Sequence, residues 1–459
     1  QASYRPIGSS ATLCFDGDFD GNNHTIKNLR IEGGARDYNG IFGYIGDNGS
    51  VRNLKVLNST VSASSQYNGI IAGYSKGKIS NVTVTGNVRC NGGKKPDYLG
   101  GIAGYSRKVT DCEFTGNISG YAYVGGITGC VYCDTISNCR VNAVIESSIL
   151  SSSIAHNVGG VVGGLQTSPT EKVCVSDSYF MGSLSDKTGY ANMGGVIGGN
   201  ANNSSVERCA SSCLISTAVK DNSTGSCGGV IGYFGGGVVE DCFSSASIIG
   251  ANATSKVGGL VGVLYKNSSS TGGPTTIRNC YFAGQIRENG EFTPAHAIHS
   301  KREEPSVVEN VYYDWQITTG NPMGADDLYG GKSTTELTDG TPLKGFDTAK
   351  WDFKAGRYPV LKGLLNDRLT DYFCGAVKLA NGQRVNNLKT NFTYPVTANV
   401  QWRLMSGNTY VQETEALKLD NGTGVVKGKM GVENLTATVE TEYGSFTRLL
   451  ALFVAPPQF

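Results

Sequence analysis

Acidic side chains are the residues with which this chain could carry out chemistry on a polysaccharide. Glycoside hydrolysis uses two carboxylates about 5 to 10 Å apart, and a lyase uses a calcium-binding carboxylate cluster with a base. Asp111, Asp177 and Asp241 occupy the same position in three copies of a repeated phrase. The intervening copies carry Asn138 and Arg208 at that position. The three acids are therefore not neighbours, and we interpret them as corner residues of a repeat.

Two segments imitate metal sites. Residues 16–21, with the sequence DGDFDG, copy the first half of a calcium loop. Position 12 of that loop is Lys27, where calcium needs a bidentate glutamate. His296 and His299 lie three residues apart beside Pro294, without the HExxH pattern of a zinc helix. We therefore predict no metal site and no cofactor.

The cysteines follow the repeat. Thirteen is an odd number, so they cannot all pair within the chain. Cys130 and Cys133 form a CxxC pair that lacks the second pair of a zinc site and the context of a redox site, which leaves a local disulfide as an alternative. Elsewhere cysteine alternates with aliphatic residues, and we expect free thiols facing the core. The repeat position reads Leu29, Leu54, Val82, Cys112, Cys139, Ser178, Cys209, Cys242, Cys280 and Val311.

Two phrases recur along the chain. The first has the form Gly-Ile-Ala-Gly-Tyr, and its successive copies start 25 to 35 residues apart. These copies begin at Gly40, Ile70, Gly101, Gly126, Gly160, Gly195, Gly229 and Gly259. The second phrase, typified by residues 136–139 (ISNC), follows each copy, and further copies around Asn28 and Asn310 bring the count to ten rungs. Periods of this length are typical of solenoids and propellers.

The repeat is built of strands. Its apolar runs are short, rich in Val and Ile, and bounded by Gly, Asn, Asp and Ser. The residue before the cysteine position is Asn or Asp in nine of ten rungs, Arg208 being the exception, and these residues tolerate the left-handed backbone of a corner. We expect them to form a hydrogen-bonded ladder, and the glycines to permit close approach of backbones. The sequence predicts an all-β protein with a parallel β-helix of about ten coils, stacked about 4.8 Å apart.

The repeated GGIAGY and ISNC phrases resemble the GLUG-motif proteins of bacterial surfaces. Residues 4–26 are similar to the first coil of that family, and residues 351–361 are similar to its closing segment. The resemblance covers about residues 4–365. It implies a right-handed coil and an extracellular place on the bacterial outer surface, any signal or lipid anchor lying outside this sequence. The chain departs from the family where other copies carry tyrosine, at Cys130, Gly164, Gly199 and Val263.

Three segments are expected. Residues 1–313 carry the β-helix repeats. Residues 314–368 lack the glycine phrase, and we interpret them as a C-terminal cap that covers the exposed coil edge. Residues 369–459 alternate like antiparallel strands and resemble bacterial immunoglobulin-like modules. Trp402 would be the core anchor of that sandwich, and Cys374, its only cysteine, cannot form the immunoglobulin disulfide.

The charge balance excludes several partners. The chain has 459 residues with 39 basic and 38 acidic side chains, so no net field draws in nucleic acid or an anionic membrane. No apolar run approaches the roughly 20 residues that cross a bilayer. We expect a soluble monomer without a membrane span in this chain.

The function expected from these observations is that of a non-enzymatic surface protein, an adhesin or a stalk that binds a glycan or a host surface protein. The alternatives are a polysaccharide-active enzyme, either a lyase or a hydrolase, and a pure structural spacer. The residues proposed to bind the ligand are Tyr44, Tyr74 and Tyr105, because sugar rings stack on aromatic side chains that a solenoid repeats in line. The alternative for these tyrosines is packing against loops or a neighbouring coil.

Overall fold

The structure is a computed structural model of the chain. No helix among the described residues is long and apolar enough to cross a membrane. The residues that the structure describes are 4–91, 97–147, 156–167, 171–187, 189–200, 204–219, 224–250, 256–265, 275–288, 291–292, 297–302, 306–318, 330–355, 357–365, 378–380, 384–385, 400–406, 409–420, 423–427, 431–441 and 444–455.

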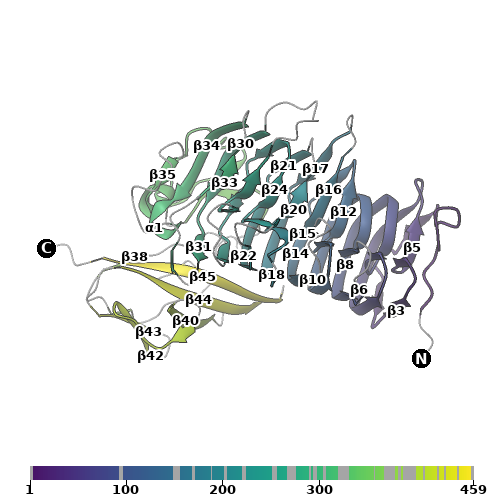
Figure 1. Cartoon of the computed structure of the whole chain (residues 1–459), viewed down its shortest axis with the longest axis horizontal. Coiled ribbons are helices and arrows are strands. Elements are labelled where there is room, and N and C mark those ends of the chain that lie inside the picture. The colour runs from purple at the N-terminus through teal and green to yellow at the C-terminus, as the bar shows by residue number, and fades with distance from the viewer. Residues whose placement is uncertain are drawn as a thin grey trace.

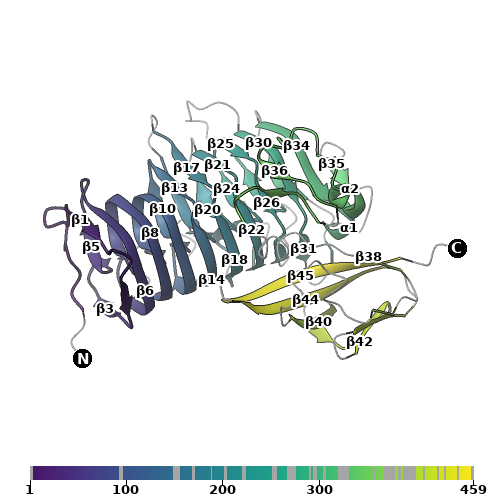
Figure 2. The same cartoon turned by 180° about the vertical axis from the view of Figure 1, so that it is seen from behind.

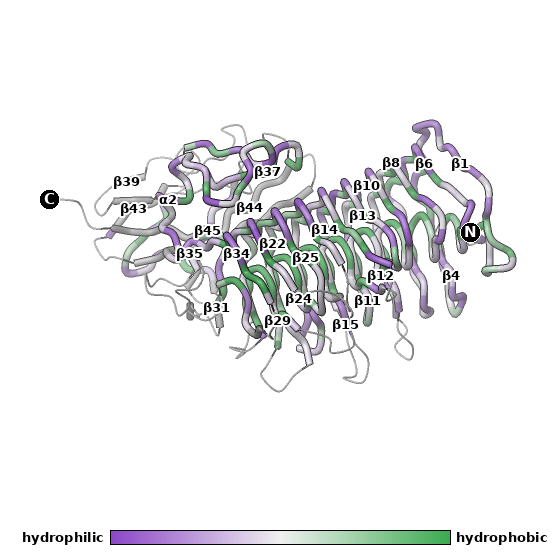
Figure 3. Tube along the Cα trace, turned by 90° about the horizontal axis from the view of Figure 1, so that it is seen from above, coloured by the Kyte–Doolittle hydropathy of each residue, from purple (hydrophilic) through white to green (hydrophobic). Residues whose placement is uncertain are grey.

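Most of the chain winds into a β-solenoid whose coils stack along the long axis of the molecule (Figure 1). About eight turns are complete, fewer than the ten rungs expected, and one sheet takes a single strand from each of eight turns. Matching strands of neighbouring coils pair parallel and in register, which confirms the stacked arrangement predicted from the repeats. Viewed from above, the coils form a row of rungs (Figure 3).

Each coil contributes strands to a few columns. The eight-stranded column contains β4 (Tyr38–Asn39), β7 (Tyr67–Asn68), β9 (Tyr98–Gly100), β11 (Tyr123–Gly125), β15 (His156–Gly159), β19 (Ala191–Gly194), β23 (Ser226–Gly228) and β28 (Val257–Gly258). The eight glycine phrases lead into β5 (Phe42–Ile45), β8 (Ala72–Cys90), β10 (Ala103–Gly120), β12 (Thr128–Tyr132), β16 (Val162–Gln166), β20 (Ile197–Asn200), β24 (Ile231–Phe234) and β29 (Val261–Leu264). Strand β33 (His299–Arg302) pairs with β29 and extends this column without a glycine phrase.

The remaining solenoid strands lie on either side of the corner that the Asn or Asp residue of the second phrase forms in each coil. Those that reach the corner are β1 (Asp18–Asp20), β6 (Ser50–Ala63), β13 (Thr135–Ser137), β17 (Val173–Ser176), β21 (Ser204–Glu207), β25 (Gly237–Glu240), β30 (Thr275–Phe282) and β34 (Ser306–Asp314). Those that follow it are β2 (Thr25–Lys27), β3 (Arg30–Gly34), β14 (Arg140–Ser147), β18 (Tyr179–Asp186), β22 (Ala210–Thr217), β26 (Phe243–Ser244), β27 (Ser247–Gly250), β31 (Gln285–Glu288), β32 (Glu291–Phe292) and β35 (Gly330–Lys332).

The corner residues have the predicted left-handed backbone. All ten predicted positions have φ between 49° and 57°, Arg208 included at 52°. The expected ladder also forms, because Asn81 Nδ2 donates to Asn53 Oδ1 at 2.7 Å. One assignment was wrong: Asn28 does not stack on Asn53. The pairing of Lys27 with Leu57 places Asn28 beside Asn58, because the corner at Asn53 is matched by residues 21–24 of the first coil, which has two extra residues there.

The glycine phrases bring two walls of the solenoid into contact. A Cβ atom on Gly198 would collide with the backbone nitrogen of Val158 and the carbonyl oxygen of Gly163. The interior is filled by one continuous hydrophobic cluster that runs through the coils. The cysteine position lies inside it, and Cys112 and Cys139 are fully buried free thiols, as predicted.

The chain then leaves the solenoid axis. After α1 (Trp315–Thr318) and β35, residues 333–365 form a strap that carries α2 (Thr334–Thr338), β36 (Trp351–Asp352) and β37 (Val360–Leu361). The strap lies alongside the last coils in Figure 3. Its side chains join a second hydrophobic cluster with outward-facing aromatic residues of the solenoid such as Tyr281 and Phe243. Part of the segment expected to cap the coil end therefore covers the flank of the coils.

The C-terminal part forms two small sheets. One has the order β38 (Lys378–Ala380), β45 (Gly444–Ala455), β44 (Gly431–Thr441), β40 (Val400–Ser406) and β41 (Thr409–Val411). The other has the order β39 (Arg384–Val385), β43 (Thr423–Val426) and β42 (Leu417–Asp420). Strand β45 runs beside β18 and β22 of the solenoid (Figure 2).

Candidate functional site

The tyrosines of the glycine phrases stack into a column. Tyr44 lies above Tyr74 with ring centroids 4.7 Å apart, and Tyr74 lies above Tyr105 at 4.6 Å. This follows from the register, which pairs Tyr44 with Tyr74 and Tyr74 with Tyr105 in β5, β8 and β10. The column ends at Cys130, which occupies the next position in β12.

A second tyrosine column, which the sequence analysis did not single out, stands against the first. It comes from the eight-stranded sheet, with neighbouring centroids 4.9 to 5.2 Å apart. Its members are Tyr38, Tyr67, Tyr98 and Tyr123. Rings of the two columns meet edge to face, as Tyr38 and Tyr44 do at 5.4 Å. The available signal was the tyrosine that stands two or three residues before each of the first four glycine phrases.

This double column is buried at Tyr44 and Tyr105 and partly exposed at its other members. Tyr44 is 5 % exposed and Tyr105 is 8 % exposed. Burial raises the pKa of Tyr44 to about 12 and raises the pKa of Tyr74 and Tyr105 further, so all three stay protonated at neutral pH. The ring faces of Tyr74 contact the rings above and below it, so a sugar could not stack on that ring without parting the column. The role of these tyrosines as ligand-binding residues remains a prediction, and their evident contribution is packing.

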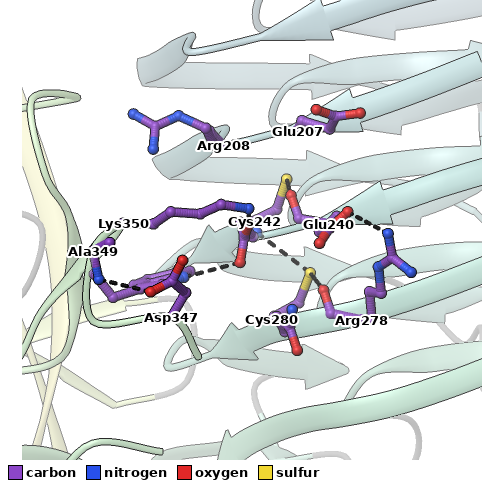
Figure 4. A network of polar contacts seen from close by, with 12 residues as sticks. Glu207, Arg208, Glu240, Cys242, Arg278, Cys280, Asp347, Ala349 and Lys350 are labelled. Atoms are coloured by element: carbon purple, nitrogen blue, oxygen red, sulfur yellow. Dashed lines mark hydrogen bonds and ion pairs between the residues drawn. The ribbon is translucent and has the colours of Figure 1, made fainter. Parts of the chain in front are cut away.

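The corner aspartates considered for catalysis are each held by a neighbour. Asp111 accepts a hydrogen bond from Asn138 Nδ2 at 2.7 Å, and Asp177 accepts one from Arg208 Nε at 2.5 Å. Asp241 is 1 % exposed and accepts hydrogen bonds from two strap residues. These are Lys350 Nζ at 2.6 Å and Trp351 Nε1 at 3.0 Å (Figure 4). The three carboxylates thus fix corners and the strap.

The charges beside Asp241 are paired as well. Arg278 donates to Glu240 at 2.7 Å (Figure 4). Arg208 also donates to the Lys362 carbonyl of the strap at 3.2 Å. The hydrogen bond to Asp241 raises the pKa of Lys350, which keeps this ammonium charged. These contacts hold the strap against the solenoid. We call the hydrogen bonds from Lys350 and Trp351 to Asp241, and from Arg208 to the Lys362 carbonyl, the clasp.

In the segment that resembles a calcium loop, the carboxylates already accept hydrogen bonds or form ion pairs within the chain. Asp16 accepts hydrogen bonds from Asn48, and Asp18 and Asp20 both pair with Arg52. His299 is buried in β33, whereas His296 lies outside the described residues. Among the residues that the structure places, no group of three or more His, Cys, Asp or Glu side chains could hold a metal ion.

The described cysteines carry free thiols. Cys130 and Cys133 are both buried and are not joined by a disulfide, so the local disulfide considered for the CxxC pair is not formed. Burial raises the pKa of Cys139 to about 12 and raises that of Cys112 well above its ordinary value, which makes these thiols poor nucleophiles. Cys374 lies outside the described residues.

A pocket of about 380 Å³ lies where β40, β41 and β42 meet. It is lined by Trp402, Arg403, Leu404, Tyr410, Val411, Gln412 and Leu419. Leu404 is fully buried and supplies an apolar floor, and Tyr410 is 55 % exposed. The Arg403 guanidinium carbon lies 4.9 Å from the centroid of the Tyr410 ring. Because side chains alternate along a strand, the pairing of Met405 with Tyr410 puts Arg403 and Tyr410 on one face of the sheet and Trp402 on the other. The pocket thus offers one exposed aromatic ring and a cation on its outer face, with Gln412 beside them in the lining.

The sequence analysis missed this site. It assigned Trp402 to the core, and the side chain does pack partly buried against the second hydrophobic cluster, but it also lines the pocket. Antiparallel pairing of β40 with β41 sets Met405 opposite Tyr410 and Leu404 opposite Val411. The available signal was the group Trp402-Arg403 followed closely by Tyr410, which is rich in residues that recognise ligands.

The fold defines this chain as a β-solenoid protein with a C-terminal β-sheet module. No protein-family profile matches it. It is 34% identical over 101 residues to "Halomucin" of Haloquadratum walsbyi, a match that covers 22% of this chain and 1% of that protein. It is 37% identical over 83 residues to a "Putative Gly-rich membrane protein" of Evansella cellulosilytica, covering 18% of this chain and 10% of that protein. The chain thus spans a tenth or less of these relatives.

A solved structure also aligns with the chain. It is described as a "putative immunoglobulin A1 protease" from Bacteroides ovatus, and the alignment covers 80% of this chain and 83% of that one. The sequence identity is 20% and the TM-score is 0.35. A similarity of that size supports no conclusion about the activity of this chain.

Proposed function

We propose that this chain is a non-enzymatic carbohydrate-binding protein of the bacterial cell surface. Its solenoid, of the GLUG type and right-handed, serves as a rigid stalk, and its C-terminal sheets form an immunoglobulin-like module that holds the ligand. The single observation that carries the proposal is the pocket at Trp402 and Tyr410. Sugar rings present apolar faces that pack on aromatic side chains, while polar groups around the rings fix their orientation.

Two further observations support a binding role. The carboxylates weighed as catalytic residues, Asp111, Asp177 and Asp241, have structural partners, and Asp241 is closed off by the strap. The names of the two relatives, a halomucin and a Gly-rich membrane protein, fit a place at the cell surface.

A glycan array probed with the full chain tests the proposal. We expect binding that falls at least tenfold in the variants Tyr410→Ala, which removes the exposed stacking surface, and Trp402→Ala, which removes part of the pocket lining. Tyr132→Ala is the matched control, since Tyr132 is a partly exposed tyrosine of β12 outside the pocket. Circular dichroism would verify that each variant is folded.

Three results would overturn the proposal. A blank array would favour the structural spacer. Equal binding by the parent and both pocket variants would place the site elsewhere, and the tyrosine column would then be tested next. Release of reducing ends or unsaturated products from a bound polysaccharide would show an enzyme.

A further inference from the structure

The pocket at the edge of the C-terminal sheet contains a cation that has no counter-ion. We infer that its ligand is an acidic saccharide whose carboxylate pairs with Arg403. This inference rests on the proposed function and adds the class of sugar. It concerns the charge of the ligand, which the aromatic rings alone would not select.

Arg403 is an exposed cation of the C-terminal sheet. Among the residues that the structure describes, its guanidinium forms no hydrogen bond and no ion pair, which is also true of Arg89 on the solenoid, but Arg403 lines the pocket and contacts the Tyr410 ring. Several other arginines on the solenoid and the strap are matched with acids. These pairs are Arg52 with Asp18 and Asp20, Arg140 with Glu113, Arg208 with Asp177, Arg278 with Glu240, and Arg357 with Asp352.

The Tyr410 ring holds the guanidinium in place. A cation 4.9 Å from a ring centroid is within the range of a cation–π interaction. Such a contact uses the flat face of the guanidinium and leaves the N–H groups along its rim available. Two parallel N–H···O hydrogen bonds from that rim match the two oxygens of a carboxylate.

The acid that follows the pocket residue Gln412 in the chain is paired elsewhere. The carboxylate of Glu413 pairs with Lys418 at 3.8 Å and with Lys427 at 3.6 Å, and not with Arg403. A neutral sugar would leave the charge of Arg403 unmatched, whereas an acidic sugar would neutralise it.

Titration calorimetry with the full chain at pH 7 tests the inference with two pairs of probes. The first pair is trigalacturonic acid and its methyl ester, and the second is sialyllactose and lactose. We expect the acidic member of at least one pair to bind roughly tenfold to hundredfold more tightly than its neutral partner, since a charged hydrogen-bond pair has about that effect. The pair that responds identifies the source of the carboxylate.

Variants separate charge recognition from folding. Arg403→Gln should abolish the preference while it keeps the neutral probe bound, and Arg403→Lys should keep part of the preference. Arg140→Gln, which breaks an ion pair on the solenoid, is the matched control and should behave as the parent.

Each outcome has one meaning. Equal binding of acidic and neutral probes by the parent would overturn the inference and leave the proposed function standing. Absence of binding to all four probes and to the array would overturn the proposed function. Loss of neutral binding in a folded Arg403→Gln variant would also overturn the inference, because Arg403 would then shape the pocket and not select the charge.

Discussion

At the scale of single residues, burial controls the pKa of Asp97, an aspartate that lies between two coils. Asp97 precedes β9 and is 2 % exposed. Its carboxylate accepts hydrogen bonds from the backbone N–H groups of Tyr121, at 2.9 Å, and Ala122, at 2.5 Å. Burial nevertheless dominates and raises the pKa of Asp97 from 3.8 to about 6. The native state thus binds this proton more tightly than the unfolded chain does.

The sign of the resulting pH dependence follows from that shift. The contribution of Asp97 to stability is complete below about pH 4 and is lost as the pH rises through about 6, a change of about 3 kcal/mol. We expect Asp97→Asn to flatten the dependence of the unfolding free energy on pH between 4 and 7, measured by urea denaturation. A variant with the same slope as the parent would contradict this account.

The glycines give a second prediction at this scale. Gly198→Ala should destabilise the protein by more than about 2 kcal/mol, because its Cβ would collide with the backbone of a facing wall. Gly17→Ala is the matched control, since its Cβ would meet only the Phe15 ring at 3.5 Å. Thermal unfolding followed by circular dichroism measures both. Equal melting temperatures of the Gly198→Ala and Gly17→Ala variants would show that the two walls of the solenoid can move apart without loss of stability.

At the scale of elements, the strap explains an anomaly in the repeat. The outward position after the cysteine carries Glu113 and Arg140 in earlier coils but Tyr179, Phe243 and Tyr281 in later coils. Those aromatic residues are buried because the strap packs on them, with Trp351 at their centre. Apolar residues on the outer face of a solenoid therefore mark the coils that another segment covers.

Removal of the clasp should release the strap. Asp241→Ala leaves the Lys350 ammonium and the Trp351 indole without their acceptor. We expect a loss of about 3 kcal/mol and rapid proteolytic cleavage within residues 333–365, detected by mass spectrometry. Asp111→Ala is the control, because it replaces a corner residue of the same backbone conformation that only accepts from Asn138. Equal protection of the strap in both variants would refute the clasp.

The elements were largely predictable and the site was not. Asn81, Asp111 and Asn138 identify the corner because a left-handed backbone is a local requirement that few residues meet. Asn28 was misplaced because the sequence does not contain the register of the first coil. Trp402 was assigned to the core because the segment resembles immunoglobulin-like modules, and it does pack against the second cluster, whereas the pocket depends on how β41 and β42 lie beside it.

At the scale of the whole molecule, the solenoid has one continuous core, so its thiols report global opening. Burial raises the pKa of Cys112, Cys139, Cys209 and Cys242. We expect these thiols to resist iodoacetamide at pH 8 in the native protein and to react together on unfolding, while the partly exposed Cys14 reacts at once. Mass spectrometry of labelled peptides gives the rates.

Separate labelling rates would argue against this picture. If one of the four thiols reacted well before the others, the coils would open one at a time rather than as a unit. Equal rates would show that neighbouring coils stabilise each other through the shared core.

By itself, the sequence determined the unit that is repeated: short strands, a left-handed corner and a glycine pair, all of which depend on the conformational preferences of residues a few positions apart. Only the tertiary structure decided what the outward side chains do. Tyr74 packs between two other tyrosines, Asp241 holds the strap, and Trp402 lines a pocket with Tyr410. Each of these contacts joins segments whose distance in space is set by stacking and docking, and no local preference encodes that distance.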